Sequence, residues 1–326
     1  MTSSERVRRA VLFQGPDRVP RCLPEPWRSD FLYVGPSADP NWKASVEGED
    51  EWGSVWEKDA AGKTMGQVKV HPLRDYGQLQ SFRFPDYDLP ERYGNAAKAI
   101  AGHAEGKFVI AGIPLSLIHR LEYLRGHVEA WTDPYEYPEE LGILLDKLAD
   151  IAIDAVNRLA DAGAEGVFSC DDWGLQDRPM VSPEVFRRFW KPRYARVYGA
   201  ARDRGMLCFL HSCGHIADLL DDFIDAGLHV IQMDQQENMG VDNLAQRFGG
   251  RLAFWCPVDI QQTMVEGSLE DIRRYAKNLI DSFGSFNGGF ISKWYPSPQA
   301  VDHTQEKINA MSEAFVEYGQ YPASAV

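Results

Sequence analysis

Two short segments of the sequence combine residues that bind metals or move protons. One reads L-H-S-C-G-H from Leu210 to His215, and the other reads C-D-D-W-G from Cys170 to Gly174. Because an extended chain aims every second side chain to the same side, His211 and Cys213 should converge. An imidazole nitrogen and a thiolate sulfur make half of a tetrahedral zinc site. We therefore predict that His211 and Cys213 bind a zinc ion.

Each segment also has a simpler interpretation. A histidine at a strand end is often hydrogen-bonded to backbone beside an inert buried thiol, and an aspartate after a strand often caps a helix or braces a loop. Two adjacent carboxylates, Asp171 and Asp172, nevertheless favour a site. We expect one of them to complete or orient the metal shell, or to protonate a departing group, and treat both as candidate catalytic residues.

A zinc site needs further ligands, and Cys256 is the candidate for the third. It ends another predicted strand in A-F-W-C-P-V-D, although a small apolar plug ahead of Pro257 is the alternative. The remaining candidates, among which the sequence does not choose, are Cys170, Asp171, Asp172 and Asp234. The aromatic residues expected to line a substrate pocket are Trp173, Trp255 and Tyr295, although most aromatic side chains at such density belong to a core.

The overall composition limits the possible partners. The 326 residues carry 34 Lys and Arg against 48 Asp and Glu, a formal charge of -14, which repels a phosphate backbone. We therefore expect no nucleic-acid partner. The chain has no run of about 18 apolar residues and no signal peptide, so we expect no membrane partner and a cytoplasmic location. Five cysteines without an export signal make a disulfide framework improbable.

From about residue 107 onward, short apolar runs alternate with longer amphipathic stretches, as in βα units around a parallel sheet. The helix predicted over Glu139 to Ala162 has an apolar stripe, and Ser182-Pro183 predicts the start of a helix that runs to about Gly199. The predicted strands are 107–113, 166–170, 206–211, 229–234, 252–256 and 289–292.

The first hundred residues are rich in proline and tryptophan and predict an elaborated N-terminal segment. One or two further strands are expected there, near Val19 to Leu23 and Val68 to His71. With the six regular strands they predict an α/β fold, a (β/α)8 TIM barrel, formed by residues 1–326 as one domain. No glycine-rich phosphate loop follows any strand, which disfavours a doubly wound sheet.

At these residues the chain resembles the uroporphyrinogen decarboxylase superfamily, and within it the cobalamin-dependent methyltransferase branch. The resemblance covers nearly the whole length. Its motifs are P-D-R-V-P (Pro16 to Pro20), D-E-W-G (Asp50 to Gly53), D-D-W-G, S-P-E-x-F (Ser182 to Phe186), K-P-R-Y (Lys191 to Tyr194), H-S-C-G and V-D-I-Q (Val258 to Gln261).

The resemblance implies a barrel with a substrate-binding mouth and a zinc ion held by His211 and Cys213. It also implies transfer of a methyl group from a small methylated compound, such as a methoxyarene, to the cobalt of a corrinoid carried by a partner protein. The methyltransferase branch usually has a further cysteine after the last strand, but the matching stretch here, S-K-W-Y-P-S-P from Ser292 to Pro298, has none.

Two other functions are compatible with the same barrel. A metal-free decarboxylase or lyase could use Arg18, Arg28 or Arg178 to bind substrate carboxylates through paired hydrogen bonds. The decarboxylases of the superfamily carry an R-Q-A-G-R segment near the start, whereas these arginines stand in a different context. A barrel that has lost catalysis and only binds a partner is the third hypothesis.

Overall fold

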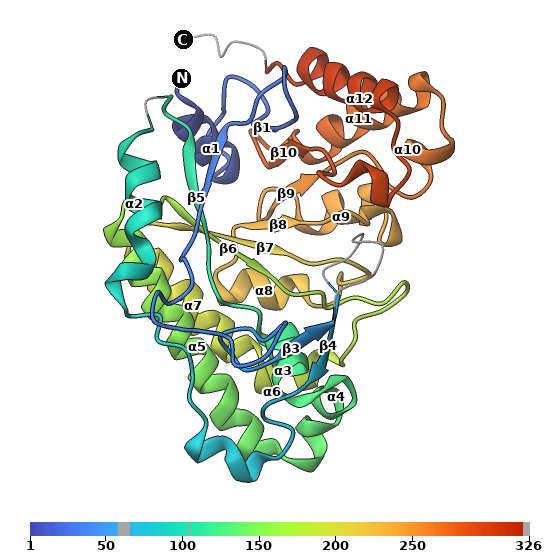
Figure 1. The fold of residues 1–326 in the computed structure, drawn as a ribbon. Helices are drawn as coiled ribbons and strands as arrows, with labels where there is room; N and C mark the ends of the chain where they lie inside the picture. Colours follow the sequence, from blue (N-terminus) through green and yellow to red (C-terminus); the bar gives the residue numbers. More distant parts are fainter. Residues whose placement is uncertain (58–65, 104, 322–326) are drawn as a thin grey trace.

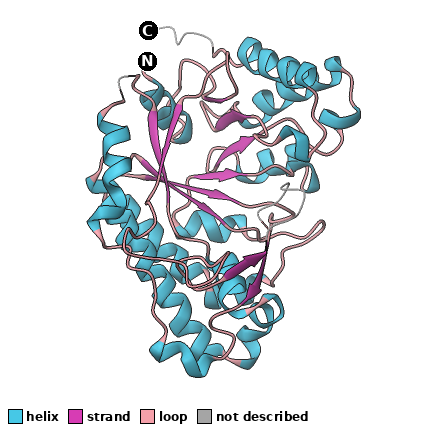
Figure 2. Ribbon diagram, viewed as in Figure 1, coloured by secondary structure: helices cyan, strands magenta, loops and turns pink. Residues whose placement is uncertain are grey.

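Eight parallel strands form the centre of the structure, in the order β1-β10-β9-β8-β7-β6-β5-β2. The computed structural model describes residues 1–57, 66–103 and 105–321. The ring closes where the Asp30 amide donates to the Arg21 carbonyl at 2.7 Å. The predicted (β/α)8 barrel is confirmed, and Figure 2 shows its strands surrounded by helices. The strands are β1 Arg21–Cys22, β2 Phe31–Val34, β5 Phe108–Gly112, β6 Gly166–Cys170, β7 Leu207–His211, β8 Val230–Gln232, β9 Ala253–Cys256 and β10 Phe290–Lys293.

The predicted strands from residue 107 onward all occur as β5 to β10, and β1 lies within Val19 to Leu23. The last predicted strand is misplaced. The segment Val68 to His71 overlaps β4 (Gln67–Val70), which pairs antiparallel with β3 (Val55–Glu57) outside the barrel. The eighth strand of the barrel is instead β2, which has four residues and pairs with β5. So short an apolar run gives no periodicity that distinguishes a strand from a loop.

The helices that cover the barrel follow the predicted pattern with one difference. Helix α5 (Pro138–Asp161) matches the long prediction, and Ser182 caps α6 (Pro183–Phe189) by accepting from the Val185 amide. The single helix predicted from Ser182 to about Gly199 is divided into α6 and α7 (Lys191–Asp203). Helix α7 starts after Trp190 with a proline in its first turn, and this proline removes an amide donor. Figure 1 shows α5 and α7 side by side along one flank.

The remaining helices complete the outer layer and the N-terminal segment (Figure 1). The α-helices are α1 Ser3–Val11, α2 Gly94–Ala101, α3 Leu117–Arg125, α4 His127–Glu136, α8 Leu220–Ala226, α9 Val241–Phe248, α10 Thr263–Glu266, α11 Leu269–Phe283 and α12 Gln305–Tyr318. The 3-10 helices are η1 Tyr76–Ser81, η2 Pro90–Tyr93, η3 Gln236–Asn238 and η4 Pro298–Ala300. Within the described ranges, none of these helices is long and apolar enough to cross a membrane.

Helix α1 closes the end of the barrel at which the strands begin. Its Val7 and Val11 pack into the interior cluster with Phe31, Phe108 and Phe209. The Gly289 amide, just before β10, donates to the Ala10 carbonyl at 2.8 Å. With this end filled by apolar side chains, a ligand has access to the interior only from the end at which the strands finish, which we call the mouth.

Candidate metal centre

The two motifs lie side by side at the mouth because their strands are neighbours in the sheet. Cys170 at the end of β6 is in register with His211 at the end of β7, and the Asp171 amide donates to the His211 carbonyl at 3.0 Å. Phe209 belongs to the interior cluster, so the alternation of β7 also turns His211 inward.

Two glycines let the loops that follow these strands cross in direct backbone contact. The Gly174 amide donates to the Cys213 carbonyl at 3.2 Å. Gly214 has a φ of +78°, and a Cβ at this position would lie 2.2 Å from the Gly174 oxygen. A side chain at either glycine would push the loops apart, so the W-G and C-G dipeptides fix the separation of Asp172 from Cys213.

Asp172, His211 and Cys213 form a triangle of potential metal ligands. The Cys213 Sγ lies 3.3 Å from the His211 Nε2, which lies 3.5 Å from the Asp172 Oδ1. The ligand atoms of the three residues all lie within 4.8 Å of one another. Tetrahedral zinc with bonds of about 2.0 to 2.3 Å separates its ligand atoms by roughly 3.3 to 3.6 Å. Three donors of N, S and O type at this spacing fit a zinc ion whose fourth position is open.

Gln232 holds the histidine in the orientation that metal binding needs. It is in register with His211 on the next strand, β8, and its Oε1 is hydrogen-bonded to the His211 Nδ1. An acceptor at Nδ1 places the proton there and leaves the lone pair of Nε2 free for a metal. Our sequence prediction did not include Gln232, although its position at the end of a predicted strand beside the H-S-C-G strand was a usable signal.

The chain after Gln232 supports the loop that carries Cys213. The Gln232 carbonyl accepts from the Ser212 amide at 3.0 Å, and the Gln235 Oε1 accepts from the Gly214 amide at 2.9 Å. The backbone amide of Asp234 forms a hydrogen bond that favours the Cys213 thiolate. Residues 232–235 therefore form a continuous brace beneath the H-S-C-G loop.

The charges at the mouth are predominantly negative without a metal. Burial raises the pKa of the Cys213 thiol, and the carboxylates of Asp172 and Asp234 raise it further. Burial together with Asp172 and Asp171 raises the pKa of Cys170 to about 12. A divalent cation would reverse this effect at Cys213, because coordination deprotonates a thiol.

The two adjacent aspartates differ completely in their surroundings. Asp172 faces the mouth with 41% of its side chain exposed. Asp171 is fully buried and accepts hydrogen bonds from the backbone amides of Leu117, Ile118 and His119 at the start of α3, and from the Tyr194 hydroxyl. Burial raises the pKa of Asp171, against these hydrogen bonds. The helix-capping interpretation thus describes Asp171, and Asp172 is the carboxylate brought to the candidate metal ligands.

The structure distributes the three candidate aromatic residues over different environments. Tyr295 is partly exposed and follows β10 at the mouth, and Asp234, Cys213 and Asp172 add to the effect of burial in raising its pKa. Trp255 is 1% exposed in the barrel interior and stacks on Phe31 at a centroid distance of 4.8 Å. Trp173 is fully buried against Phe186, Trp190 and Tyr194 and has no surface for a ligand.

Cys256 and Arg18 are not brought to the triangle. Cys256 is fully buried in the outer apolar cluster, while its neighbour Trp255 points into the interior. Arg18 donates to Asp30 at 2.8 and 2.9 Å, at the end of the barrel where β2 begins. Every residue of β9 is buried, so its run of apolar residues does not show on which side of the strand Cys256 lies.

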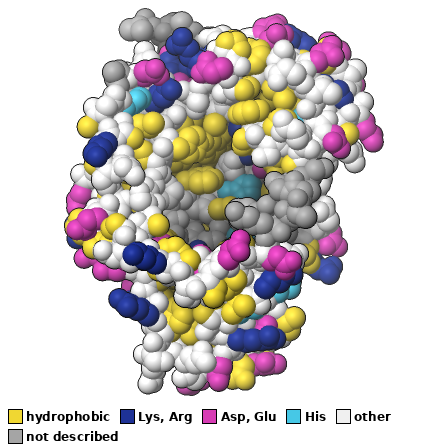
Figure 3. Space-filling view, viewed as in Figure 1, with side chains coloured by type: hydrophobic (Ala, Val, Ile, Leu, Met, Phe, Trp, Pro, Cys, Tyr) yellow, Lys and Arg dark blue, Asp and Glu magenta, His cyan; other side chains and the backbone are white. Residues whose placement is uncertain are grey.

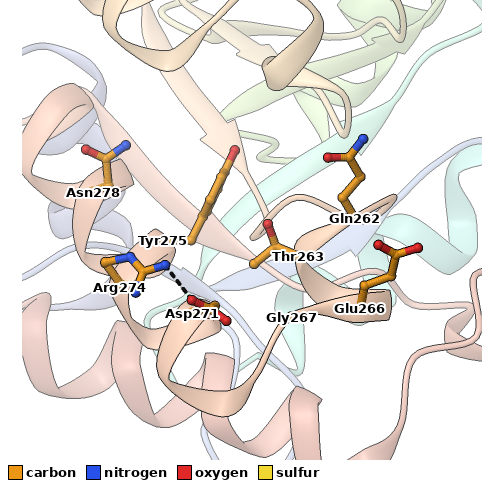
Figure 4. A pocket seen from close by; sticks show the side chains of 8 residues that line it. All are labelled: Gln262, Thr263, Glu266, Gly267, Asp271, Arg274, Tyr275 and Asn278. Atoms are coloured by element: carbon orange, nitrogen blue, oxygen red, sulfur yellow. Dashed lines mark hydrogen bonds and ion pairs between the residues drawn. The ribbon is translucent and has the colours of Figure 1, made fainter.

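The mouth is visible as a hollow in the molecular surface. Figure 3 shows hydrophobic side chains along its wall and a histidine inside it. A separate cavity of about 570 Å³ lies between α10 and α11 (Figure 4) and shares no residue with the triangle. Its Asp271 pairs with Arg274 and closes the capping box of α11 with Ser268, so these charges stabilise a helix end.

Comparisons with known proteins agree with this architecture. The model of the family "Uroporphyrinogen decarboxylase (URO-D)" matches residues 63–317. A solved structure described as a methyltransferase from Methanosarcina mazei superimposes with a TM-score of 0.72 at 17% identity, covering 98% of this chain and 99% of that one. At this identity the likeness concerns the fold.

Curated relatives in sequence are uroporphyrinogen decarboxylases. The protein of Aeromonas salmonicida is 25% identical over 76% of this chain and 71% of its own length. That of Geobacillus kaustophilus is 33% identical over 52% of this chain and 50% of its own length. The match to the Magnetococcus marinus protein, 25% identical over 55% of this chain, also spans 50% of that relative.

Proposed function

Because the chain belongs to the uroporphyrinogen decarboxylase family, we propose from this premise that it is a zinc-dependent methyltransferase of the O-demethylase type. It moves a methyl group from a small methylated substrate, such as a methoxyarene, to a corrinoid carried by a partner protein. The observation that carries this proposal is the convergence of Asp172, His211 and Cys213 at the mouth, with His211 oriented by Gln232.

The residues of the mouth have distinct tasks in this reaction. His211, Cys213 and Asp172 would hold the zinc ion, which when bound would supply Lewis acidity at the heteroatom that loses its methyl group. Gln232 keeps Nε2 of His211 unprotonated. Tyr295 follows β10 at the mouth and would contact the substrate there, and Trp255 forms part of the apolar floor of the interior. Asp171 holds the start of α3 and acts only as a positioning residue.

Access of the partner follows from the shape and charge of the molecule. Helix α1 fills one end of the barrel, so a corrinoid must approach from the mouth, where Figure 3 shows the hollow. The chain has a formal charge of -14, which favours a partner with a basic or neutral docking face.

The decarboxylase hypothesis loses support because its candidate arginines are not at the triangle. Arg18 is paired with Asp30 at the opposite end, Arg178 is an exposed partner of Asp177, and Arg28 is exposed in the turn before β2. Release of carbon dioxide from an acidic substrate by the purified protein would restore that hypothesis.

The test combines metal analysis with methyl transfer. Purified protein should retain about one zinc per chain, and His211→Ala and Cys213→Ser should each lose it together with at least about 1,000-fold in methyl transfer to cob(I)alamin. Cys208→Ser, at a buried thiol away from the mouth, is the matched control and should keep both. Wild-type protein that binds no stoichiometric transition metal ends the proposal.

A further inference from the structure

A lysine is buried beside the candidate metal centre. Lys293 ends β10 and is 5% exposed, and its Nζ donates to the Asp234 Oδ1 at 2.6 Å. Ile291, two residues earlier, belongs to the interior cluster, so strand alternation directs Lys293 inward at the mouth. It stands in the S-K-W-Y-P-S-P stretch, which lacks the additional cysteine of the methyltransferase branch.

The ammonium group of Lys293 has N–H donors without a hydrogen-bond acceptor among the described residues. Among the residues that the structure describes, its Nζ forms one hydrogen bond, to Asp234, whereas an ammonium carries three N–H donors. Taking a charged group out of water costs several kcal/mol, and a well-packed apolar pair in its place is often at least as stable. A buried ion pair with unused donors at the mouth is therefore poorly explained by stability alone.

Two observations place the Lys293–Asp234 pair next to the triangle. Asp234 lies between Gln232, whose carbonyl accepts from the Ser212 amide at 3.0 Å, and Gln235, whose Oε1 accepts from the Gly214 amide at 2.9 Å, so it is next to the loop that carries Cys213. Lys293 ends β10 and Asp234 lies two residues after β8, and these strands flank β9, so the pair crosses the end of β9 at the mouth. The pair and the triangle therefore both face the mouth, where a bound substrate would lie between them.

We propose that Lys293 is the proton donor to the heteroatom that loses its methyl group, and that Asp234 positions it. This inference rests on the function proposed above. The bond from the methyl carbon to the heteroatom breaks, and its electron pair stays on the heteroatom. The methyl group passes to the cobalt(I) corrinoid, whose electron pair forms the new bond. Nζ gives one proton to the heteroatom, and the neutral amine regains a proton from water.

The placement suits this task chemically. An alkoxide or phenoxide is a poor leaving group, and general acid catalysis at such an atom contributes about 100- to 10,000-fold. Asp172 is expected to be ionised as a zinc ligand, and Asp171 is sealed behind α3, so neither aspartate has a proton to offer at the open side. Among the described residues of β8, β9 and β10, Lys293 is a cation with unused N–H donors.

Leaving-group dependence tests the role directly. Methyl transfer to cob(I)alamin is measured for aryl methyl ethers whose phenols span several pKa units, with wild-type protein, Lys293→Met and Lys293→Arg. We expect Lys293→Met to lose about 100-fold or more on the ether of the least acidic phenol and less than about 5-fold on a nitrophenyl ether, which needs no protonation. Zinc content should stay at the wild-type level.

Lys293→Arg separates catalysis from structure. Arginine keeps the positive charge and the pairing with Asp234, but its guanidinium does not release a proton in proteins. We therefore expect it to show the same leaving-group dependence as Lys293→Met. Rescue by arginine, or an equal loss across the ether series, would assign Lys293 a structural role and overturn the inference. Loss of transfer by the wild-type protein itself would instead refute the proposed function, and the inference with it.

Discussion

The two ends of the barrel both contain buried charges, but they satisfy them differently. At the end closed by α1, Asp30 accepts hydrogen bonds from the Ser3 hydroxyl, the Arg6 and Arg18 guanidinium groups and the Arg21 amide. Arg6 in turn binds Asp17. At the mouth, Lys293 forms one side-chain hydrogen bond with the described part of the chain, and three ligand atoms face one another across the space that a cation would fill.

This difference indicates that the charges at the closed end stabilise the fold, whereas the charged groups at the mouth serve metal binding and catalysis. A buried carboxylate with four donors is fully compensated and fixes the closing turn between β1 and β2. The groups at the mouth are held by neighbours from behind, as Gln232 holds His211, while the ligand atoms of Asp172, His211 and Cys213 all lie within 4.8 Å of one another. Substitutions at the closed end should therefore change folding, and substitutions at the mouth should change metal binding or turnover.

The largest effect on folding should come from Asp30→Asn. Removing one member of a buried ion pair leaves Arg18 without its counter-charge and Arg6 with Asp17 alone, which costs about 3 to 5 kcal/mol of the free energy of unfolding. Denaturation by urea measures this loss. The refolded or surviving native protein should still bind zinc in the wild-type ratio, because Asp30 lies at the end away from the triangle.

The pH dependence of Asp30→Asn provides the control. Burial opposes ionisation of Asp30, but hydrogen bonding to Arg18, Ser3 and the Arg21 amide together with the Arg18 charge holds its pKa below the usual range. A depressed pKa contributes stability above the unfolded-state value, and this contribution disappears as the pH falls through the folded-state value. The variant should lack this part of the acid destabilisation, and an unchanged acid limb would contradict the assignment.

At the mouth, Gln232→Leu should weaken zinc binding. Without the acceptor for its Nδ1 proton, His211 loses its fixed tautomer and orientation, so zinc affinity should fall about 10- to 100-fold. Competition with a chromogenic chelator measures this change. Gln232→Glu keeps an acceptor at the same position and should retain most of the affinity, and its failure to do so would show that the amide has another role.

The sequence predicted the fold well where elements were long or regular. The strands from β5 to β10 and helix α5 follow directly from apolar runs and a helical stripe, whereas the four residues of β2 carry too little pattern to identify. The pair His211 and Cys213 was found because their spacing alone aims both to one side. Which of Asp171 and Asp172 faces the mouth depends on the packing of α3, and that contact joins segments more than fifty residues apart.

The smallest effect on stability should come from Arg18→Lys. This substitution also tests whether the substrate binds at the mouth or at the closed end of the barrel. Arg18 binds both oxygens of Asp30, and lysine keeps the charge but not the paired hydrogen bonds, so the free energy of unfolding should fall by about 1 kcal/mol. In a decarboxylase that clamps a substrate carboxylate with Arg18, the same change would raise KM strongly. The structure places Arg18 at the opposite end from the mouth, so kcat and KM for methyl transfer should stay within about twofold of the wild-type values, since no contact of Arg18 changes between substrate and transition state. A rise in KM without loss of stability would mean that the closed end of the barrel takes part in substrate binding.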